Sequence, residues 1–210
     1  MERALIFIGG EAPDVLPLEV MGRYSRIIAA DSGYDKAKAF GISPDIVLGD
    51  MDSTGYRDEI IDRGFSACPE DKDDSDFVLA LKAAETMDYD LIGGGEGRLD
   101  HLISILSAFH DYRAPKLWLT RCDVLFCSRH FKAELEEGTQ ISFFPADLSK
   151  SARVNTSGLV WDLDGHDISL SFISLSNRVE KRDVEIVSSE SLLIRFPMDF
   201  FRVKPKILLC

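Results

Sequence analysis

The chain has 210 residues, of which 45% are hydrophobic and 29% charged, and its formal net charge is −12. These values are typical of a globular protein with one domain or two small ones, and they exclude disordered, collagen-like and coiled-coil chains. The acidic balance argues against a nucleic-acid-binding protein, because phosphate contacts need a surplus of lysine and arginine. The longest early apolar run, residues 4–8, is far too short for a membrane span or a secretory segment. We therefore expect a soluble, cytoplasmic protein that binds neither nucleic acid nor membranes.

The first 128 residues alternate short apolar runs with helical patterns. Strands that alternate with helices form βαβ units, so residues 1–128 predict an α/β domain with a mostly parallel sheet and flanking helices. In such sheets, ligands bind beyond the carboxyl ends of the strands. The expected strands are 4–8, 27–30, 46–48, 89–92, 117–120 and 124–127, and the expected helices are 34–40, 56–63, 75–87 and 99–112.

Beyond residue 128 the pattern changes to short segments separated by Gly, Asn, Asp and Ser. Several of them alternate apolar and polar residues, and no long amphipathic helix is visible. This pattern is typical of a small antiparallel sandwich or barrel, so we expect an all-β sandwich domain over residues 129–210. The expected strands are 131–136, 139–144, 152–155, 159–163, 168–173, 178–188 and 191–196.

The negative charge is concentrated in residues 45–76, where eleven acidic residues accompany three basic ones. Within this stretch, Gly49-Asp50-Met51-Asp52-Ser53 follows the predicted strand 46–48. In extended backbone, residues two apart point the same way, so Asp50 and Asp52 can converge on one point. Two close carboxylates repel unless a cation lies between them, and hard oxygen ligands suit Mg²⁺. The alternative is an Asp-rich turn whose side chains bond local amides.

A second acidic cluster, residues 71–76, immediately precedes an apolar helix. Helix capping explains part of it, with Asp74 or Ser75 as the N-cap and Asp76 in the first turn. Capping does not require four carboxylates in six positions. One or two of these residues are therefore candidates for metal or substrate binding.

The glycine-rich segment 93–101 joins a predicted strand to a predicted helix. Glycines ahead of a helix N-terminus offer amides to an anion, and Arg98 adds a two-pronged donor for phosphate. The spacing matches neither the dinucleotide-binding nor the P-loop motif. A glycine-rich turn with Asp100 as a cap is the alternative. Together, the three clusters at strand ends predict Mg²⁺-dependent chemistry on a phosphorylated substrate, without naming the acceptor.

The motifs also occur in a recognisable order. In the first domain they are Ala30-Asp31-Ser32-Gly33, Gly41-Ile42-Ser43-Pro44-Asp45, Gly49-Asp50-Met51-Asp52-Ser53, Asp71-Lys72-Asp73-Asp74-Ser75-Asp76 and Gly97-Arg98-Leu99-Asp100-His101; in the second they are Thr156-Ser157-Gly158-Leu159-Val160-Trp161-Asp162-Leu163 and Ser174-Leu175-Ser176-Asn177. In order and approximate spacing, over essentially the full chain, they resemble the thiamine pyrophosphokinase (thiamine diphosphokinase) family. Ser32 stands where that family commonly has Gly, and Ser75 where it usually has Thr. Neither change removes a group that the chemistry needs.

The resemblance implies transfer of a pyrophosphoryl group from ATP to thiamine, giving thiamine diphosphate and AMP, with Mg²⁺ as cofactor. It also implies a homodimer whose active sites lie between the α/β domain of one subunit and the β-sandwich of the other. A different Mg²⁺-dependent phosphotransferase or a nucleotide hydrolase is the alternative enzyme. A module that binds thiamine or its diphosphate without turnover is a further alternative, which broken acidic pairs would favour.

The resemblance and the chemistry of the side chains together nominate the site residues. Asp50, Asp52 and Asp76 are the expected Mg²⁺ ligands, and Arg98 with the glycine amides is expected to neutralise transferred charge. Asp31 or Asp100 would orient or deprotonate the thiamine hydroxyl. Trp161 offers a flat face to the cationic thiamine rings, its alternative being an ordinary core position. The expected catalytic residues are Asp31, Asp50, Asp52, Asp76, Arg98 and Asp100; the expected ATP-binding residues are Gly95, Gly97, Arg98, Asp100 and His101; and the expected thiamine-binding residues are Trp161, Ser174, Ser176 and Asn177, the last two as partners of the pyrimidine edge.

Overall fold

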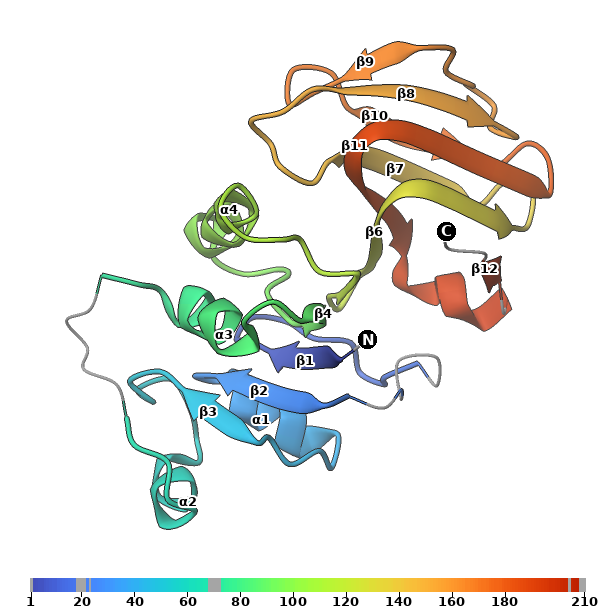
Figure 1. Cartoon of the computed structure of the whole chain (residues 1–210). Coiled ribbons are helices and arrows are strands. Elements are labelled where there is room, and N and C mark those ends of the chain that lie inside the picture. Colours follow the sequence, from blue (N-terminus) through green and yellow to red (C-terminus); the bar gives the residue numbers. More distant parts are fainter. Residues whose placement is uncertain (1, 18–21, 23, 68–72, 204, 208–210) are drawn as a thin grey trace. The chain divides into compact units, whose positions relative to one another are not determined.

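The computed structural model describes residues 2–17, 22, 24–67, 73–203 and 205–207 (Figure 1). The chain divides into two compact units. The first unit comprises Met1–Ile105 and Trp118–Arg121, and the second comprises Leu106–Leu117 and Cys122–Cys210. No helix within the described residues is both long and apolar enough to span a lipid bilayer.

The first unit is built on a sheet with the strand order β5-β4-β1-β2-β3. β1 pairs with β2 and β4, and β2 with β3, in every case in parallel, as the βαβ pattern predicts. The strands are β1 (Arg3–Phe7), β2 (Arg26–Ala30), β3 (Ile46–Leu48), β4 (Asp88–Ile92) and β5 (Leu117–Leu119), and the helices are α1 (Gly33–Ala39), α2 (Arg57–Asp62), α3 (Asp76–Ala84) and α4 (Leu99–Ala108). The end of α4 and the first residue of β5 fall within the ranges of the second unit. Every strand and helix expected before residue 121 is therefore present.

Helix α3 shows how local sequence sets an element and its ends. Its N-cap is Ser75, whose Oγ accepts a hydrogen bond of 3.3 Å from the amide of Val78. Phe77, Ala80, Leu81 and Ala84 recur on one buried face, which packs on β2 and β3. The helix ends at Ala84 because Glu85 has a positive φ of 56°. It is therefore shorter than the predicted 75–87.

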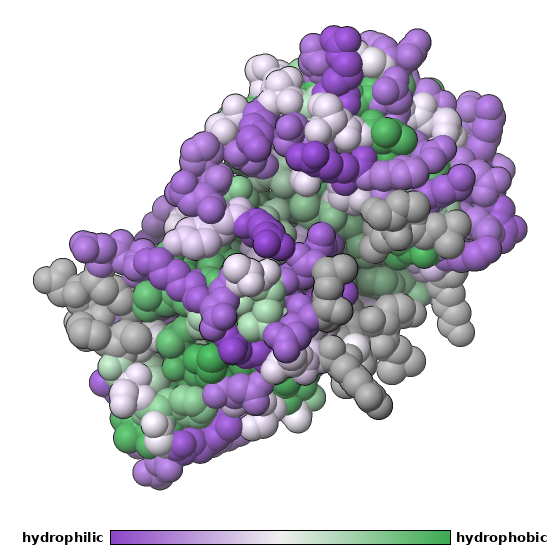
Figure 2. All heavy atoms as spheres, viewed as in Figure 1, coloured by the Kyte–Doolittle hydropathy of each residue, from purple (hydrophilic) through white to green (hydrophobic). Residues whose placement is uncertain are grey.

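The second unit is β-rich, and its strands pair antiparallel. Its path of neighbours is β10-β7-β11-β6, with β8 pairing with β11 and β9, and β12 with β6. Hydrophilic side chains predominate on the visible face of this unit (Figure 2). The elements are β6 (Asp123–Glu134), β7 (Gln140–Pro145), β8 (Ala152–Ser157), β9 (His166–Ile168), β10 (Ser174–Arg178), β11 (Asp183–Pro197), the 3-10 helix η2 (Met198–Val203) and β12 (Lys206–Ile207).

Several expected boundaries in this unit are wrong. The segments 124–127 and 131–136 belong to the single strand β6, and most of 178–188 and 191–196 to the single strand β11. β11 pairs with β8 through Glu185–Ser188 and with β7 through Leu192–Arg195, and its register shifts between Val187 and Leu192. The polar residues at that irregularity interrupt the apolar pattern, so the sequence suggests two strands where one strand bends.

The segment 159–163, predicted as a strand, instead contains a turn at residues 160–161 followed by residues without regular structure. Its one strand-like contact is an isolated bridge between Leu159 and Val179. Strand β10, by contrast, has no counterpart among the expected strands, because its residues are mostly polar. Both differences concern the region that carries the predicted thiamine-binding residues.

Candidate functional site

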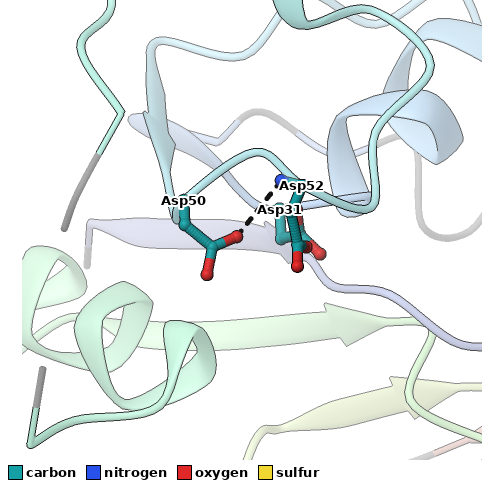
Figure 3. Close-up of side chains that lie close together, drawn as sticks. All are labelled: Asp31, Asp50 and Asp52. Carbon is teal, nitrogen blue, oxygen red and sulfur yellow. Dashed lines mark hydrogen bonds between the residues drawn. The ribbon is translucent and has the colours of Figure 1, made fainter. Parts of the chain in front are cut away.

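Three carboxylates converge beyond the carboxyl ends of β2 and β3 (Figure 3). Asp31 follows β2, and Asp50 and Asp52 lie in the loop after β3; one carboxylate oxygen from each lies within 4.8 Å of the others. The two strands are parallel neighbours, with Ala30 opposite Leu48, so their ends meet at one edge of the sheet. The sequence therefore predicted correctly that this edge gathers acidic side chains.

Glycine at position 49 permits the close approach of the two strand ends. The amide of Asp31 donates a 2.7 Å hydrogen bond to the carbonyl oxygen of Leu48. A Cβ atom on Gly49 would lie only 3.2 Å from the Asp31 backbone, and Gly49 has a φ of 123°. A side chain there would strain the backbone and crowd Asp31.

The loop brings Asp50 and Asp52 together by a different geometry from the extended backbone that we expected. Met51, between them, has a φ of 62° and is only 1% exposed. The amide of Asp52 donates to Asp50 Oδ1 at 3.1 Å, and the Ser53 hydroxyl donates to Asp52 Oδ1 at 2.7 Å. The Asp-rich turn with a local amide bond is thus present, and it also makes the carboxylates converge, while Mg²⁺ binding stays a prediction.

Helix α1 fixes the far end of this loop through Asp35. Its carboxylate accepts hydrogen bonds from the Thr54 hydroxyl and, at 3.1 Å, from the amide of Gly55. The same helix begins two residues after Asp31, so one short element holds both sides of the carboxylate cluster. Sequence reasoning missed this role, since nothing distinguishes Asp35 from the other acidic residues near it.

Burial raises the pKa of Asp31 above its ordinary value, and the neighbouring charges of Asp76 and Asp52 act in the same direction. One of its oxygens, Oδ1, is buried and has no hydrogen-bond partner. A buried carboxylate oxygen without a donor is costly unless a ligand satisfies it. Three hard oxygen donors that include such an atom fit a Mg²⁺ ion.

Asp76 holds a neighbouring position rather than a place in this group of three. It is half-buried in the first turn of α3, with Ser75 as the N-cap, as the capping interpretation predicted. Asp74 is bound to the Lys82 ammonium at 2.6 Å. Asp71, another residue of this acidic cluster, lies outside the described residues.

The glycine-rich segment packs tightly, and two of its amides already have partners. The amide of Gly93 donates to Leu119 at 2.9 Å, and that of Gly94 donates to Gly9 at 2.7 Å. A Cβ atom on Gly95 would lie 2.3 Å from the Thr120 Cβ. Close contacts with β5 and with the segments that follow β1 and β5 therefore explain Gly93, Gly94 and Gly95 without an anion. Gly97, with a φ of 120°, has open space where a Cβ atom would be.

Arg98 and Asp100 form an exposed pair at the start of α4. Arg98 donates to the two carboxylate oxygens of Asp100, through Nη2 at 2.5 Å and Nε at 3.1 Å. This pairing lowers the pKa of Asp100 to about 2. His101, in the first turn of the same helix, is exposed. The guanidinium is thus already arranged to bind two oxygens side by side.

In the second unit, Trp161 lies on a turn beside β10 and is 54% exposed, so it is not a core tryptophan. The guanidinium carbon of Arg178 lies 5.5 Å from the centre of its ring. Ser176 has a φ of 55°, and its amide donates to Ser142 Oγ at 2.9 Å. Ser174 is the first residue of β10.

Asn177 differs from the expected partner of a pyrimidine edge. Its side chain is 3% exposed and bonds to the backbone: Oδ1 accepts from the amides of Trp161 at 3.2 Å and Arg178 at 2.8 Å, and Nδ2 donates to the Trp161 carbonyl at 2.8 Å. The carboxamide is thus directed at the turn that carries Trp161.

Comparison with known proteins identifies two family models in the chain. "Thiamin pyrophosphokinase, catalytic domain" matches residues 19–120, and "Thiamin pyrophosphokinase, vitamin B1 binding domain" matches residues 129–193. The chain is 28% identical over 172 residues to thiamine pyrophosphokinase 1 of Arabidopsis thaliana, an alignment that covers 71% of this chain and 64% of that protein. The match thus spans slightly less than two thirds of the curated relative.

Solved structures share the fold over nearly the whole chain. Thiamine pyrophosphokinase from Bacillus subtilis gives a TM-score of 0.71 at 22% identity, covering 93% of this chain and 98% of that one. Thiamin pyrophosphokinase from Candida albicans gives a TM-score of 0.71 at 14% identity, covering 94% and 89%.

Proposed function

Because the chain belongs to the thiamin pyrophosphokinase family, we propose that it transfers the pyrophosphoryl group of ATP to the hydroxyl of thiamine, giving thiamine diphosphate and AMP. The observation that carries this proposal is the convergence of Asp31, Asp50 and Asp52 within the stretch that matches the catalytic domain. Magnesium nucleotides are bound by such oxygen clusters.

Asp31, Asp50 and Asp52 are the residues that would hold Mg²⁺. The fit is supported by the separation of their oxygens and by the unpartnered Oδ1 of Asp31. An ion held by these residues would supply positive charge that neutralises the ATP phosphates. Asp76 remains a candidate for a further ligand, because its charge already acts on Asp31.

Arg98 is proposed to bind the transferred phosphates through the two guanidinium nitrogens, Nε and Nη2, that donate to Asp100 in this structure. A carboxylate presents two oxygens much as a phosphate does, so the Asp100 carboxylate keeps the guanidinium in a phosphate-binding conformation. Gly97 and His101 remain candidates for ATP contacts at the same helix start. Gly95 is better explained by its packing against Thr120.

Neither Asp31 nor Asp100 needs to remove the proton of the thiamine hydroxyl before the phosphoryl group is transferred. Phosphoryl transfer passes through a loose transition state in which positioning and charge neutralisation dominate. Asp100, whose pKa is about 2, is a weak proton acceptor at neutral pH. Asp31, whose pKa is raised, is the stronger base of the two, although we propose it as a metal ligand.

Trp161 is proposed to stack on thiamine, with Ser174 and Ser176 as hydrogen-bonding candidates. The half-exposed indole in the stretch that matches the vitamin B1 binding domain supports this assignment.

We also propose that the chain has two domains, over residues 1–128 and 129–210, and that the second is a two-layer sandwich. We propose that the protein is a cytoplasmic homodimer whose active sites contain residues of both subunits. The division between the two family matches supports this boundary.

Product analysis tests the proposal against its alternatives. The protein is incubated with ATP, Mg²⁺ and thiamine, and nucleotides and thiamine phosphates are separated by chromatography. The proposed reaction yields equal amounts of AMP and thiamine diphosphate, both dependent on thiamine. ADP or inorganic phosphate as the product would indicate another phosphotransferase or a hydrolase, and thiamine binding without any product would indicate a sensor.

A further inference from the structure

The side chain of Asn177 is a buried polar group whose hydrogen bonds converge on one neighbouring turn. With 3% of its surface exposed, it lies in β10 and reaches the main chain of Trp161 with both ends of its carboxamide. Its oxygen also accepts from the amide of Arg178. Asn177 therefore fixes the backbone of both partners in the Trp161–Arg178 pair.

A second side chain fixes the same turn from its other end. The carboxylate of Asp162 accepts from the Thr156 hydroxyl at 3.0 Å, from the amide of Leu159 at 3.0 Å and from the amide of Gly158 at 3.2 Å. The turn is thus braced on both sides of the indole. Trp161 is therefore half-exposed on a turn whose backbone is hydrogen-bonded on both sides.

We propose that Asn177 is a positioning residue that holds Trp161 in place as the platform for thiamine. The inference rests on the proposed function, because it assigns Asn177 an effect on thiamine through Trp161 rather than through a direct contact. Asparagine suits the task, since one oxygen accepts two amides while one nitrogen donates to a carbonyl. Aspartate would keep the acceptor and lose the donor, placing a carboxylate against the Trp161 carbonyl oxygen.

Steady-state kinetics of Asn177→Ala and Asn177→Asp, at saturating Mg²⁺, form the first part of the test. A displaced platform weakens stacking, so we expect the KM for thiamine to rise about five- to tenfold. The KM for ATP and kcat should change less than about twofold, because loss of binding that is equal in the ground state and the transition state raises KM without changing kcat. Asn155→Ala is a control for the loss of a side-chain bond to the backbone: the exposed Asn155 also accepts from a backbone amide, that of Gly165 at 2.8 Å instead of that of Trp161.

Fluorescence provides a measurement that a purely structural role would not change. Trp118, the other tryptophan, is 2% exposed, so iodide should quench Trp161 selectively. In folded Asn177→Ala, Trp161 should show altered quenching and lower anisotropy before thiamine is added. Wild-type quenching and an unchanged KM for thiamine in a folded variant would overturn the inference. An equal fall in kcat, in kcat/KM for thiamine and in kcat/KM for ATP, together with a lower Tm, would also overturn the inference.

A double-mutant comparison separates this inference from the proposed function. If Asn177 acts through the indole, Asn177→Ala should have no further effect on thiamine KM in a Trp161→Ala background. An additional loss in that background would show a direct contact and refute positioning. If Trp161→Ala itself leaves the KM for thiamine unchanged, the platform role of Trp161 fails. If Asn177→Ala does not fold, Asn177→Asp decides by the same comparison.

Discussion

Replacing Asp52 by Asn should stabilise the metal-free protein while it abolishes most of the turnover. Asp52 shares a cluster with two other carboxylates whose oxygens lie within 4.8 Å. At that separation, each pair of charges repels by about 0.9 kcal/mol at the dielectric constant of water and by about 3.5 kcal/mol at an effective value of about 20. Because Asp52 is exposed, the lower figure applies. Removing both of its repulsions should therefore contribute about 1–2 kcal/mol to stability.

Asparagine preserves the local bond that Asp52 makes. Its amide oxygen can still accept from the Ser53 hydroxyl, which lies 2.7 Å from Asp52 Oδ1. Mg²⁺ should offset this advantage and, at about one hundred times the dissociation constant, reverse the order of stability, because binding to the native state stabilises it by about 1.4 kcal/mol at ten times the dissociation constant and by about 2.7 kcal/mol at one hundred times. The wild type should gain this stabilisation when Mg²⁺ is added, and Asp52→Asn should gain little of it.

Urea unfolding in EDTA and in MgCl₂, with turnover measured on the same preparations, checks both effects. Asp14→Asn, which removes an exposed carboxylate outside the cluster, is the control. A lower stability of Asp52→Asn than of the wild type in EDTA would contradict repulsion within the carboxylate cluster. The metal assignment would be contradicted if Asp52→Asn turned over as fast as the wild type. It would also be contradicted if Mg²⁺ did not change the stability of the wild-type protein.

Three further predictions concern the first unit. Arg98→Lys keeps the charge but removes the planar fork, so kcat/KM for ATP should fall about tenfold, and a fall in stability alone would contradict the phosphate role. Asp90→Asn breaks the pair that Arg3 makes with this 2%-exposed carboxylate, and urea unfolding should show a loss of about 2–3 kcal/mol, below the usual range for buried pairs since Arg3 is partly exposed. The raised pKa of Asp31 means that its ionised form destabilises the metal-free fold, so Asp31→Asn in EDTA should be more stable than the wild type at pH 7. That advantage should shrink as the pH falls through the raised pKa of Asp31 toward the ordinary value of 3.8, and an advantage independent of pH would contradict the assignment.

The elements of the first unit were accessible from the sequence because each has its own local signal. Apolar runs such as 46–48 end at turn residues, and Ser75 marks the beginning of α3. The convergence of Asp31 with Asp50 was less accessible, since it depends on which strands are neighbours. The sequence placed both residues at strand ends, but the order β1-β2-β3 joins them.

The second unit was predicted less well, because pairing rather than periodicity sets its elements. The bend in β11 looks like a strand boundary, and the polar strand β10 has no apolar signal. The turn at Trp161 reads as a strand because its apolar residues are consecutive. Its actual conformation depends on hydrogen bonds from Asp162 and Asn177, which sequence patterns do not reveal.

Pyrophosphoryl transfer to thiamine can be followed with ATP that is labelled radioactively in its β-phosphate. With Mg²⁺ and thiamine present, the label should pass to thiamine diphosphate, while AMP forms unlabelled in equal amount. Asp52→Asn, shown to be folded, should transfer little of it. Label retained in ADP alongside thiamine monophosphate, or label transfer that does not require thiamine, would contradict the claim.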